Sequence, residues 1–479
     1  MDQRVQEFEV GERKDYRVYR DRRQELCEQI QKIAPKVSQA TIFVWGACEQ
    51  EGQLFRQDSS FYYLTGIDEP GAVLVLTLDN HATIYVPQYR DSRAKWVGES
   101  LEPSNEKAAE LCVDEIAYVG NPVSGYSMQE YGDLADYAYL IERLVQSFAK
   151  KIPVMGLFSR KRESQYRIQC MKSLWLANYI SEWNSELLFD ITPIVSLIRR
   201  DKGDDEAAAI YKAIEITILG HTGAGGSIKP GSFEREIQAN IEHLMTIAHA
   251  RCAFPSIVAS GKNGTILHYT ANNQKMKAGD LVVVDIGAEY GYYCGDLTRT
   301  YPVSGTFSKR QRELYTIVLE TQAYIEDIVR PGYWLSNKDE PEKSLYHSAK
   351  KFLKDCGGYD EYFTHGIGHF LGLDVHDVGD SEIPLMPGDV ITIEPGIYMP
   401  HEGVGIRIED NYWLSDDGLI CLSENLPKQP EDIEQFMKEE STNHTDDDDE
   451  QEYEYDDNDD DNYEEDMPAY GKKYSEVSH

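Results

Sequence analysis

A short segment of the sequence concentrates residue types that bind metals or carry protons. Residues 364–379, THGIGHFLGLDVHDVG, contain His365, His369 and His376, a quarter of the chain's twelve histidines. Histidine ligates metals and titrates near neutral pH, so the segment alone is compatible with a metal site, a proton-transfer site or a polar loop. The positions of the carboxylates decide among these.

Four carboxylates in the same half of the chain each interrupt an apolar run typical of a buried strand: Asp285, Asp296, Glu394 and Glu409. One such Asp is commonly a turn or cap residue. An ionised carboxylate in a core is costly, however, unless a cation accompanies it. Four of them around a histidine cluster predict a pair of divalent ions about 3.5–4 Å apart, an arrangement suited to metal-assisted hydrolysis.

The segments that position these residues alternate between strand-like and helix-like patterns. Strands are predicted at residues 40–47, in a hairpin over 71–88, and within 281–305, 388–399 and 403–415. Apolar residues at helical spacing predict helices over 137–152 and 311–329. A charged, glycine-containing stretch from Arg199 to Glu206 marks a domain junction. We therefore expect an α/β domain over residues 8–175 and a strand-rich domain over residues 190–430.

Composition and charge exclude several classes of function. The 479 residues carry a formal charge of −37, and residues 431–479 contain 21 acidic and 3 basic side chains. This low-complexity segment predicts a disordered acidic tail. Such acidity disfavours binding to nucleic acid or anionic membranes, and no apolar run approaches the length of a membrane span. Eight scattered cysteines without a CxxC pair predict free thiols and a cytoplasmic location.

The ordered set of candidate ligands resembles the five-ligand dinuclear site of the pita-bread metallopeptidases, which include methionine aminopeptidase, prolidase and aminopeptidase P. The similarity is strongest to aminopeptidase P. NGTILHYTANN, DLVVVDIGAEYGYYCGDLTRTYPVSG, HGIGHFLGLDVHDVG, EPGIY and GIRIEDNYW resemble its blocks in order, and RVYRDRRQEL and FRQDSSFYYLTGIDEPGAVLVL resemble its non-catalytic domain. The resemblance covers about residues 8–430. It implies a pita-bread α+β catalytic domain over residues 190–430, preceded by the α/β domain.

The resemblance also implies roles for individual residues. The implied metal ligands are Asp285, Asp296, His369, Glu394 and Glu409. Asp296 and Glu409 would bridge two ions, of which Mn²⁺ is the first candidate and Co²⁺, Fe²⁺ and Zn²⁺ are alternatives. Glu394 would also carry a proton.

Further residues are implied to contact the substrate or its neighbours. His268, His365 and His376 would hydrogen-bond the scissile region, and Arg407 would orient groups around the bridging acid. Val375 and Tyr398 would shape a pocket for a proline ring, and Trp96 would reach the site of a neighbouring subunit. Ser60 stands where the family often has Asp or Asn.

The implied activity is removal of the N-terminal residue from peptides with proline in second position, by a homodimer or homotetramer. A prolidase, which acts on Xaa-Pro dipeptides, would carry the same ligands. A non-catalytic pita-bread module that binds peptides or histones is an alternative of another class, favoured by the acidic tail. The occupied ligand positions argue against that module, and against a metal-free hydrolase such as creatinase.

Overall fold

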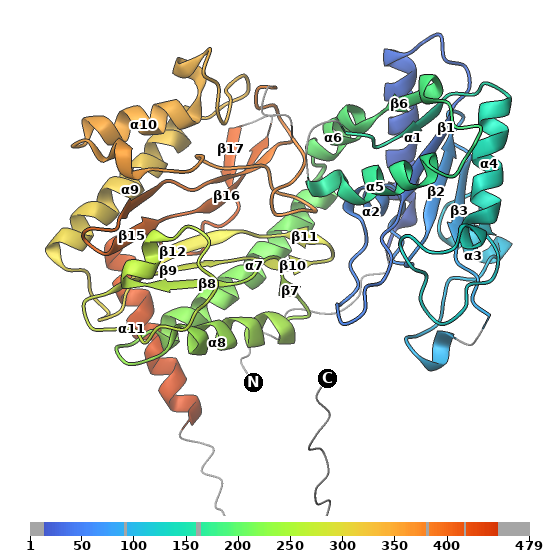
Figure 1. The fold of residues 1–479 in the computed structure, drawn as a ribbon. Helices are drawn as coiled ribbons and strands as arrows, with labels where there is room; N and C mark the ends of the chain where they lie inside the picture. The colour runs from blue at the N-terminus through green and yellow to red at the C-terminus, as the bar shows by residue number, and fades with distance from the viewer. Residues whose placement is uncertain (1–13, 91–92, 160–163, 380–382, 416–417, 449–479) are drawn as a thin grey trace, which may run out of the picture.

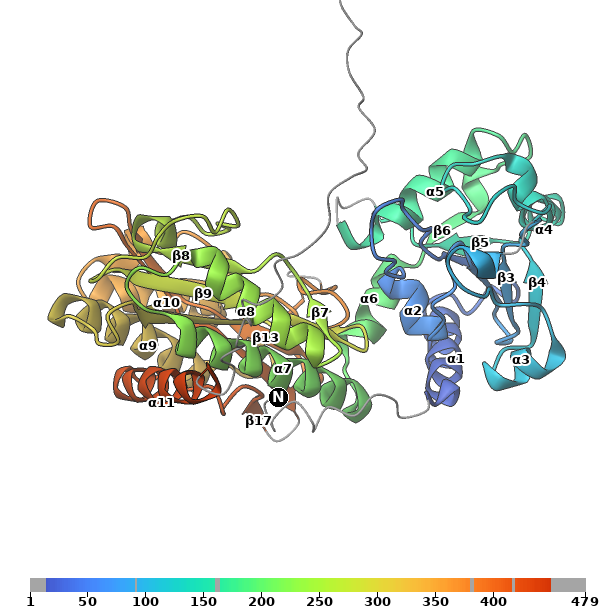
Figure 2. The same ribbon diagram turned by 90° about the horizontal axis from the view of Figure 1, so that it is seen from below.

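The computed structural model describes residues 14–90, 93–159, 164–379, 383–415 and 418–448 and shows two domains side by side (Figures 1 and 2). Helix α6 (Thr192–Arg200) lies between them, and α7 (Asp204–Ser227) begins the second domain. Within this part of the chain, no helix is long and apolar enough to cross a bilayer. All eight cysteines are free, as predicted.

The N-terminal domain is built on one six-stranded mixed sheet with the strand order β4-β3-β2-β1-β5-β6. The strands are β1 (Thr41–Trp45), β2 (Val73–Thr77), β3 (Ala82–Val86), β4 (Glu115–Tyr118), β5 (Val154–Gly156) and β6 (Leu188–Asp190). The predicted strand over 40–47 and hairpin over 71–88 are confirmed, because β2 and β3 pair antiparallel. Strand β6 pairs with β5, so the sheet extends beyond the expected domain end at residue 175.

Helices cover both faces of this sheet. Ile42 and Val44 of β1 pack into a core with α1 (Tyr16–Ile33) and α2 (Ser59–Thr65). Phe43 and Trp45 pack into a second core with α4 (Ala138–Ala149) and α5 (Arg167–Ala177). Because successive side chains of a strand point to opposite faces, an unbroken apolar strand needs cover on both sides. Helix α4 confirms the prediction over 137–152.

The second domain packs helices around short antiparallel sheets with the strand orders β12-β9-β8, β13-β16-β17, β14-β15 and β11-β10-β7. Its strands are β7 (Arg251–Cys252), β8 (Ile257–Ser260), β9 (Leu281–Ile286), β10 (Ala288–Tyr290), β11 (Tyr293–Cys294), β12 (Leu297–Pro302), β13 (Val390–Ile393), β14 (Gly396–Met399), β15 (Val404–Arg407), β16 (Asp410–Ser415) and β17 (Gly418–Cys421). Its further helices are α8 (Glu234–Ile247), α9 (Lys309–Ile328), α10 (Leu345–Asp355) and α11 (Pro430–Asp448). The strands predicted in this half and the helix over 311–329 are confirmed.

Helix α11 occupies the beginning of the segment predicted to be a disordered tail. Ile433 and Met437, four residues apart on one helical face, are buried in the core of the second domain. Arg312 of α9 forms ion pairs with Glu431 and Glu434. The predicted boundary at residue 431 is therefore too early, because the amphipathic start of this segment docks as a helix. The acidic residues 449–479 lie outside the described residues.

Candidate metal centre and active site

Strand pairing in the second domain brings the predicted carboxylates together. Strands β9 and β12 pair with Asp285 opposite Thr298, and an isolated bridge places Thr298 opposite Glu409. Asp296 immediately precedes β12, and Glu394 immediately follows β13. Register fixes which side chains share a face of a pleated sheet, so residues distant in sequence converge.

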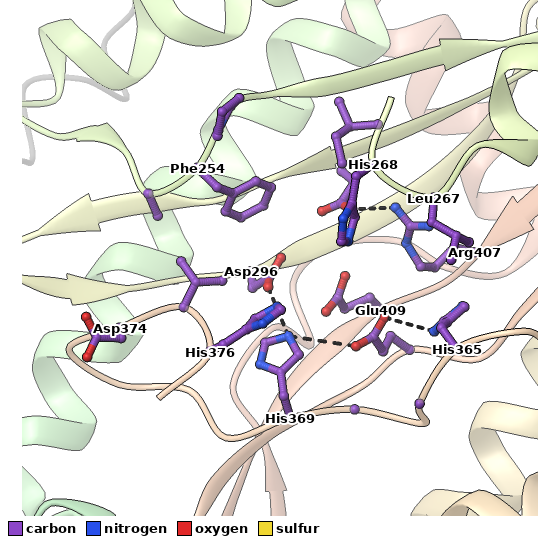
Figure 3. A pocket seen from close by; sticks show the side chains of 18 of the residues that line it. Phe254, Leu267, His268, Asp296, His365, His369, Asp374, His376, Arg407 and Glu409 are labelled. Atoms are coloured by element: carbon purple, nitrogen blue, oxygen red, sulfur yellow. Dashed lines mark hydrogen bonds and ion pairs between the residues drawn. The ribbon is translucent and has the colours of Figure 1, made fainter. Parts of the chain in front are cut away.

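The five predicted metal ligands line one cavity of about 820 Å³. Nε2 of His369 lies 3.4 Å from Asp296 and 3.7 Å from Glu394, and Figure 3 shows Asp296 and His369 directed toward one another. Ligand atoms of Asp296, His369 and Glu409 all lie within 4.8 Å of one another. Nδ1 of His369 donates to the carbonyl of Phe370 at 3.0 Å, which leaves the Nε2 lone pair facing the carboxylates.

The electrostatics of this cluster fit divalent cations. Burial, followed by repulsion from Asp285 and Glu394, raises the pKa of Asp296 well above its usual value. Burial and Asp296 do the same to the pKa of Glu409. Oδ1 of Asp285 is buried and has no hydrogen-bond partner among the described residues. Oxygen-rich donors with one imidazole and an unused buried carboxylate oxygen suit hard or borderline divalent metals.

Arg407 and Thr298 support the acids from the side of the strands. Arg407 donates to Asp285 at 2.5 Å and, through Nε, to the Thr298 hydroxyl at 3.2 Å. That hydroxyl donates in turn to Oε2 of Glu409 at 2.7 Å. Sequence reasoning missed Thr298, although its position two residues after Asp296 was a usable signal. Arg407 therefore reaches Glu409, one of the two acids that the resemblance makes bridging ligands, through this threonine.

His376, His268 and Val375 line the same cavity. The ring centroids of His376 and His369 are 4.1 Å apart. Burial, with smaller contributions from the charges of His369 and His268, lowers the pKa of His376 to about 4. The imidazole of His376 is therefore uncharged near neutral pH and can accept or donate a hydrogen bond at a substrate.

His365 also lines the cavity, but Tyr398 does not. Nδ1 of His365 lies 3.4 Å from Glu394, and its Nε2 lies 2.8 Å from the Tyr398 hydroxyl. Arg407 donates to the same hydroxyl at 2.9 Å. Burial, followed by the charge of Arg407, lowers the pKa of His365 to about 3. The structure thus places Tyr398 behind His365 and Arg407 rather than against the substrate space.

Two residues of the N-terminal domain that the sequence singled out lie away from the metal cluster. Trp96 is 70% exposed, stacks on Tyr126 and does not line the cavity of its own chain. Ser60 is fully buried and its hydroxyl accepts a hydrogen bond from Arg199 at 3.0 Å, within the same chain. Gln165 from the same domain does line the cavity, and sequence reasoning missed it.

Two family models match the chain: "Aminopeptidase P, N-terminal domain" over residues 19–123 and "Metallopeptidase family M24" over residues 208–416. The Xaa-Pro aminopeptidase of Escherichia coli (strain K12) is 34% identical over 454 residues, which are 88% of this chain and 97% of the relative. This chain belongs to the aminopeptidase P group of metallopeptidase family M24. Human Xaa-Pro aminopeptidase 3 is 31% identical over 415 residues, 81% of this chain and 78% of the relative.

Solved structures of the family agree with this assignment. A putative aminopeptidase P from Bacillus anthracis superposes with a TM-score of 0.74 at 28% identity, covering 90% of this chain and 100% of that chain. Zn-substituted E. coli aminopeptidase P in complex with product gives a TM-score of 0.72 at 30% identity, with coverages of 90% and 99%. The family and the two-domain pita-bread architecture predicted from the sequence are confirmed, and membership in M24 supports divalent metal at the cluster.

Proposed function

We propose that this protein is a Xaa-Pro aminopeptidase, which hydrolyses the bond before a proline in second position. The convergence of five metal-binding side chains in one cavity, next to uncharged imidazoles, supports this proposal most directly. The 34% identity to the E. coli Xaa-Pro aminopeptidase, over nearly the whole of that relative, supports the substrate class.

We propose two divalent ions at the site, with Mn²⁺ as the first candidate. The ligands would be Asp285, Asp296, His369, Glu394 and Glu409, with Asp296 and Glu409 shared between the ions. Bound divalent ions supply the Lewis acidity that activates a water molecule and polarises the carbonyl. Four ionised carboxylates in a buried cluster would balance the positive charge of two divalent cations, and Arg407 pairs with one of them, Asp285.

The chain's own residues would orient the substrate and move protons. An uncharged His376 or His365 can donate a hydrogen bond to the carbonyl oxygen as negative charge develops on it. Glu394, 3.4 Å from His365, is the proposed carrier of a proton to the leaving prolyl nitrogen. Val375 and Phe254, which line the cavity, offer apolar contact for a proline ring.

The assembly and location that we propose rest on separate features. The exposed stacked pair Trp96 and Tyr126 suits a subunit contact, so we propose a homodimer or homotetramer in which Trp96 approaches a neighbouring site. Eight free thiols suit the reducing cytoplasm. Sedimentation analysis of the full chain tests the first proposal, because a monomer at micromolar concentration contradicts it.

One preparation tests the activity. The protein is stripped of metal, reloaded with Mn²⁺, and assayed for metal content and for cleavage of an Xaa-Pro-Yaa tripeptide, an Xaa-Pro dipeptide and an Xaa-Ala-Yaa tripeptide. We expect about two ions per chain and preferential cleavage of the proline tripeptide. Cleavage of the dipeptide alone would identify a prolidase instead. A fully loaded protein that cleaves none of the three would refute the proposal.

A further inference from the structure

A short segment of the second domain carries two cavity residues while lying against the N-terminal domain. Residues Leu373–Asp377 include Val375 and His376, and an acid flanks this pair on each side. Figure 3 shows Asp374 at the edge of the cavity, on the same loop as His376. No regular secondary structure supports this segment, so other contacts must hold it in place.

Arg199 at the end of α6 contacts both flanking acids. It donates to Asp374 at 2.9 Å and to Asp377 at 2.5 Å, and it is 1% exposed. Lys202 donates to the other oxygen of Asp377 at 2.9 Å. Although burial favours the neutral acid, the charges of Lys202 and Arg199 hold the pKa of Asp377 below its usual value. Asp377 is therefore a carboxylate at neutral pH. By binding both acids, Arg199 links the two ends of the Val375–His376 pair.

Further hydrogen bonds from the same part of the chain reach this segment. Ser59 donates to Asp374 at 2.7 Å, and Arg56 donates to the Leu373 carbonyl at 2.5 Å. Gln165 donates to the carbonyl of His376 at 2.5 Å. These donors, like Arg199 and Lys202, precede residue 203 and lie outside the M24 match over residues 208–416. By contrast, another cavity histidine, His365, contacts Tyr398 of the second domain itself.

We propose that Arg199 is a positioning residue, through which the N-terminal domain fixes His376 and Val375 against the metal centre. This inference rests on the proposed function. Nη2 of Arg199 makes the bonds to both acids, while its Nη1 donates to the Ser60 hydroxyl at 3.0 Å. Because the guanidinium is planar, this third contact fixes the directions of the two Nη2–H bonds, whereas the ammonium of Lys rotates freely and lacks the third contact. Small displacements of a reacting group lower rates steeply, about a hundredfold for roughly 1 Å.

The neighbouring residue provides a matched control. Arg200 lies on the same helix and is also 1% exposed. It forms a two-point ion pair with Asp389 at 2.5 and 2.6 Å and donates to the Pro384 carbonyl at 2.8 Å. These partners are also in the second domain but lie outside Leu373–Asp377. Arg200→Met therefore removes an equally buried interdomain charge without freeing the His376 segment.

The test uses the full Mn²⁺-loaded chain with Arg199→Met, Arg199→Lys, Arg200→Met and Gln165→Ala, and measures thermal stability, metal content, kcat and KM on an Xaa-Pro-Yaa tripeptide. We expect both Met variants to lose similar Tm and to keep their metal. Arg199→Met should lower kcat about a hundredfold and Arg199→Lys by less, whereas Arg200→Met should stay within about threefold of the parent. Gln165→Ala, at the rim, should fold normally and lose several-fold in kcat.

A second readout does not depend on catalysis. In histidine-labelled protein loaded with diamagnetic Zn²⁺ in place of Mn²⁺, the imidazole signal that disappears in His376→Ala should shift in Arg199→Lys and Gln165→Ala but not in Arg200→Met. Equal kcat in the Arg199 and Arg200 variants, or an unmoved His376 signal, overturns the inference. If Arg199→Met fails to fold, Arg199→Lys and Gln165→Ala decide by the same criteria. An inactive parent protein would instead refute the proposed function, and the His376 signal would still report on positioning.

Discussion

Replacing Thr298 with valine should weaken metal binding without altering any of the five proposed metal ligands. The Thr298 hydroxyl donates to Glu409 at 2.7 Å and accepts from Nε of Arg407 at 3.2 Å. Valine has nearly the same shape, so the substitution removes these two bonds and leaves the packing. Glu409 loses the donor that orients it, and a buried guanidinium N–H loses its acceptor.

The magnitude follows from the lost hydrogen bond to Glu409. A hydrogen bond to a charged group contributes about 1.5–3 kcal/mol. Loss of a partner that orients a metal ligand typically lowers metal affinity by about 10–100-fold, which corresponds to about 1.4–2.8 kcal/mol. The two estimates agree. We therefore expect the dissociation constant for Mn²⁺ to rise by about one to two orders of magnitude.

Calorimetric titration of metal-free protein with Mn²⁺ measures this change directly. Thr300→Val is the matched control, because Thr300 is also fully buried on β12 and its hydroxyl bonds only the backbone of Arg407, at 3.0 and 3.1 Å, in the described contacts. Both variants should lose stability, and only Thr298→Val should lose affinity. Unchanged Mn²⁺ affinity in Thr298→Val, or equal losses in both variants, would refute the proposed role of the hydroxyl.

Four further substitutions have distinct expected results. Asp296→Asn should remove both metal binding and turnover, because this acid lies at the centre of the cluster; metal analysis and a peptide assay measure both. His376→Ala should keep its metal and lose about 10²–10⁴-fold in kcat, whereas His369→Ala should lose metal. His221→Gln should reduce the amount of folding stability that is lost as the pH falls. Burial, then the charge of Arg299, lowers the pKa of His221 to about 3, so protons favour the unfolded chain between about pH 6.5 and 3.

Each of these predictions can be contradicted by a specific result. Full activity in Asp296→Asn would exclude it as a shared ligand, and metal loss in His376→Ala with retention in His369→Ala would reverse the two histidine roles. For His221, lowering the pH from 6.5 to 5 should reduce the free energy of unfolding in urea by about 1.6 kcal/mol more in the parent than in the variant, because the unfolded imidazole takes up a proton over this range. Gln can still donate to the Leu297 carbonyl, which His221 contacts at 3.1 Å. Parallel stability curves for parent and variant would contradict the assignment.

Local sequence patterns were sufficient to predict strands β1 to β3 and β9 to β16, helices α4 and α9, and the types and order of the proposed metal ligands, whereas strands β4 to β8 and β17 were not predicted. Apolar runs over 281–286 and 390–393 predict β9 and β13, because alternation and β-branched side chains act over a few neighbouring positions. An acid that ends such a run is visible in the same way. The family resemblance then assigned Asp285 and Glu394 to a shared metal site.

Only the tertiary structure decided which residues support that site. Thr298 and Glu409 are 111 positions apart, and Arg199 and Asp377 are 178 positions apart, so their contacts depend on strand register and domain docking. The same holds for α11, because only the folded domain offers the apolar surface against which one face of this helix packs. Periodicity reports the conformation of a segment, whereas the partner of each buried polar group is set by surfaces that meet after the chain has folded.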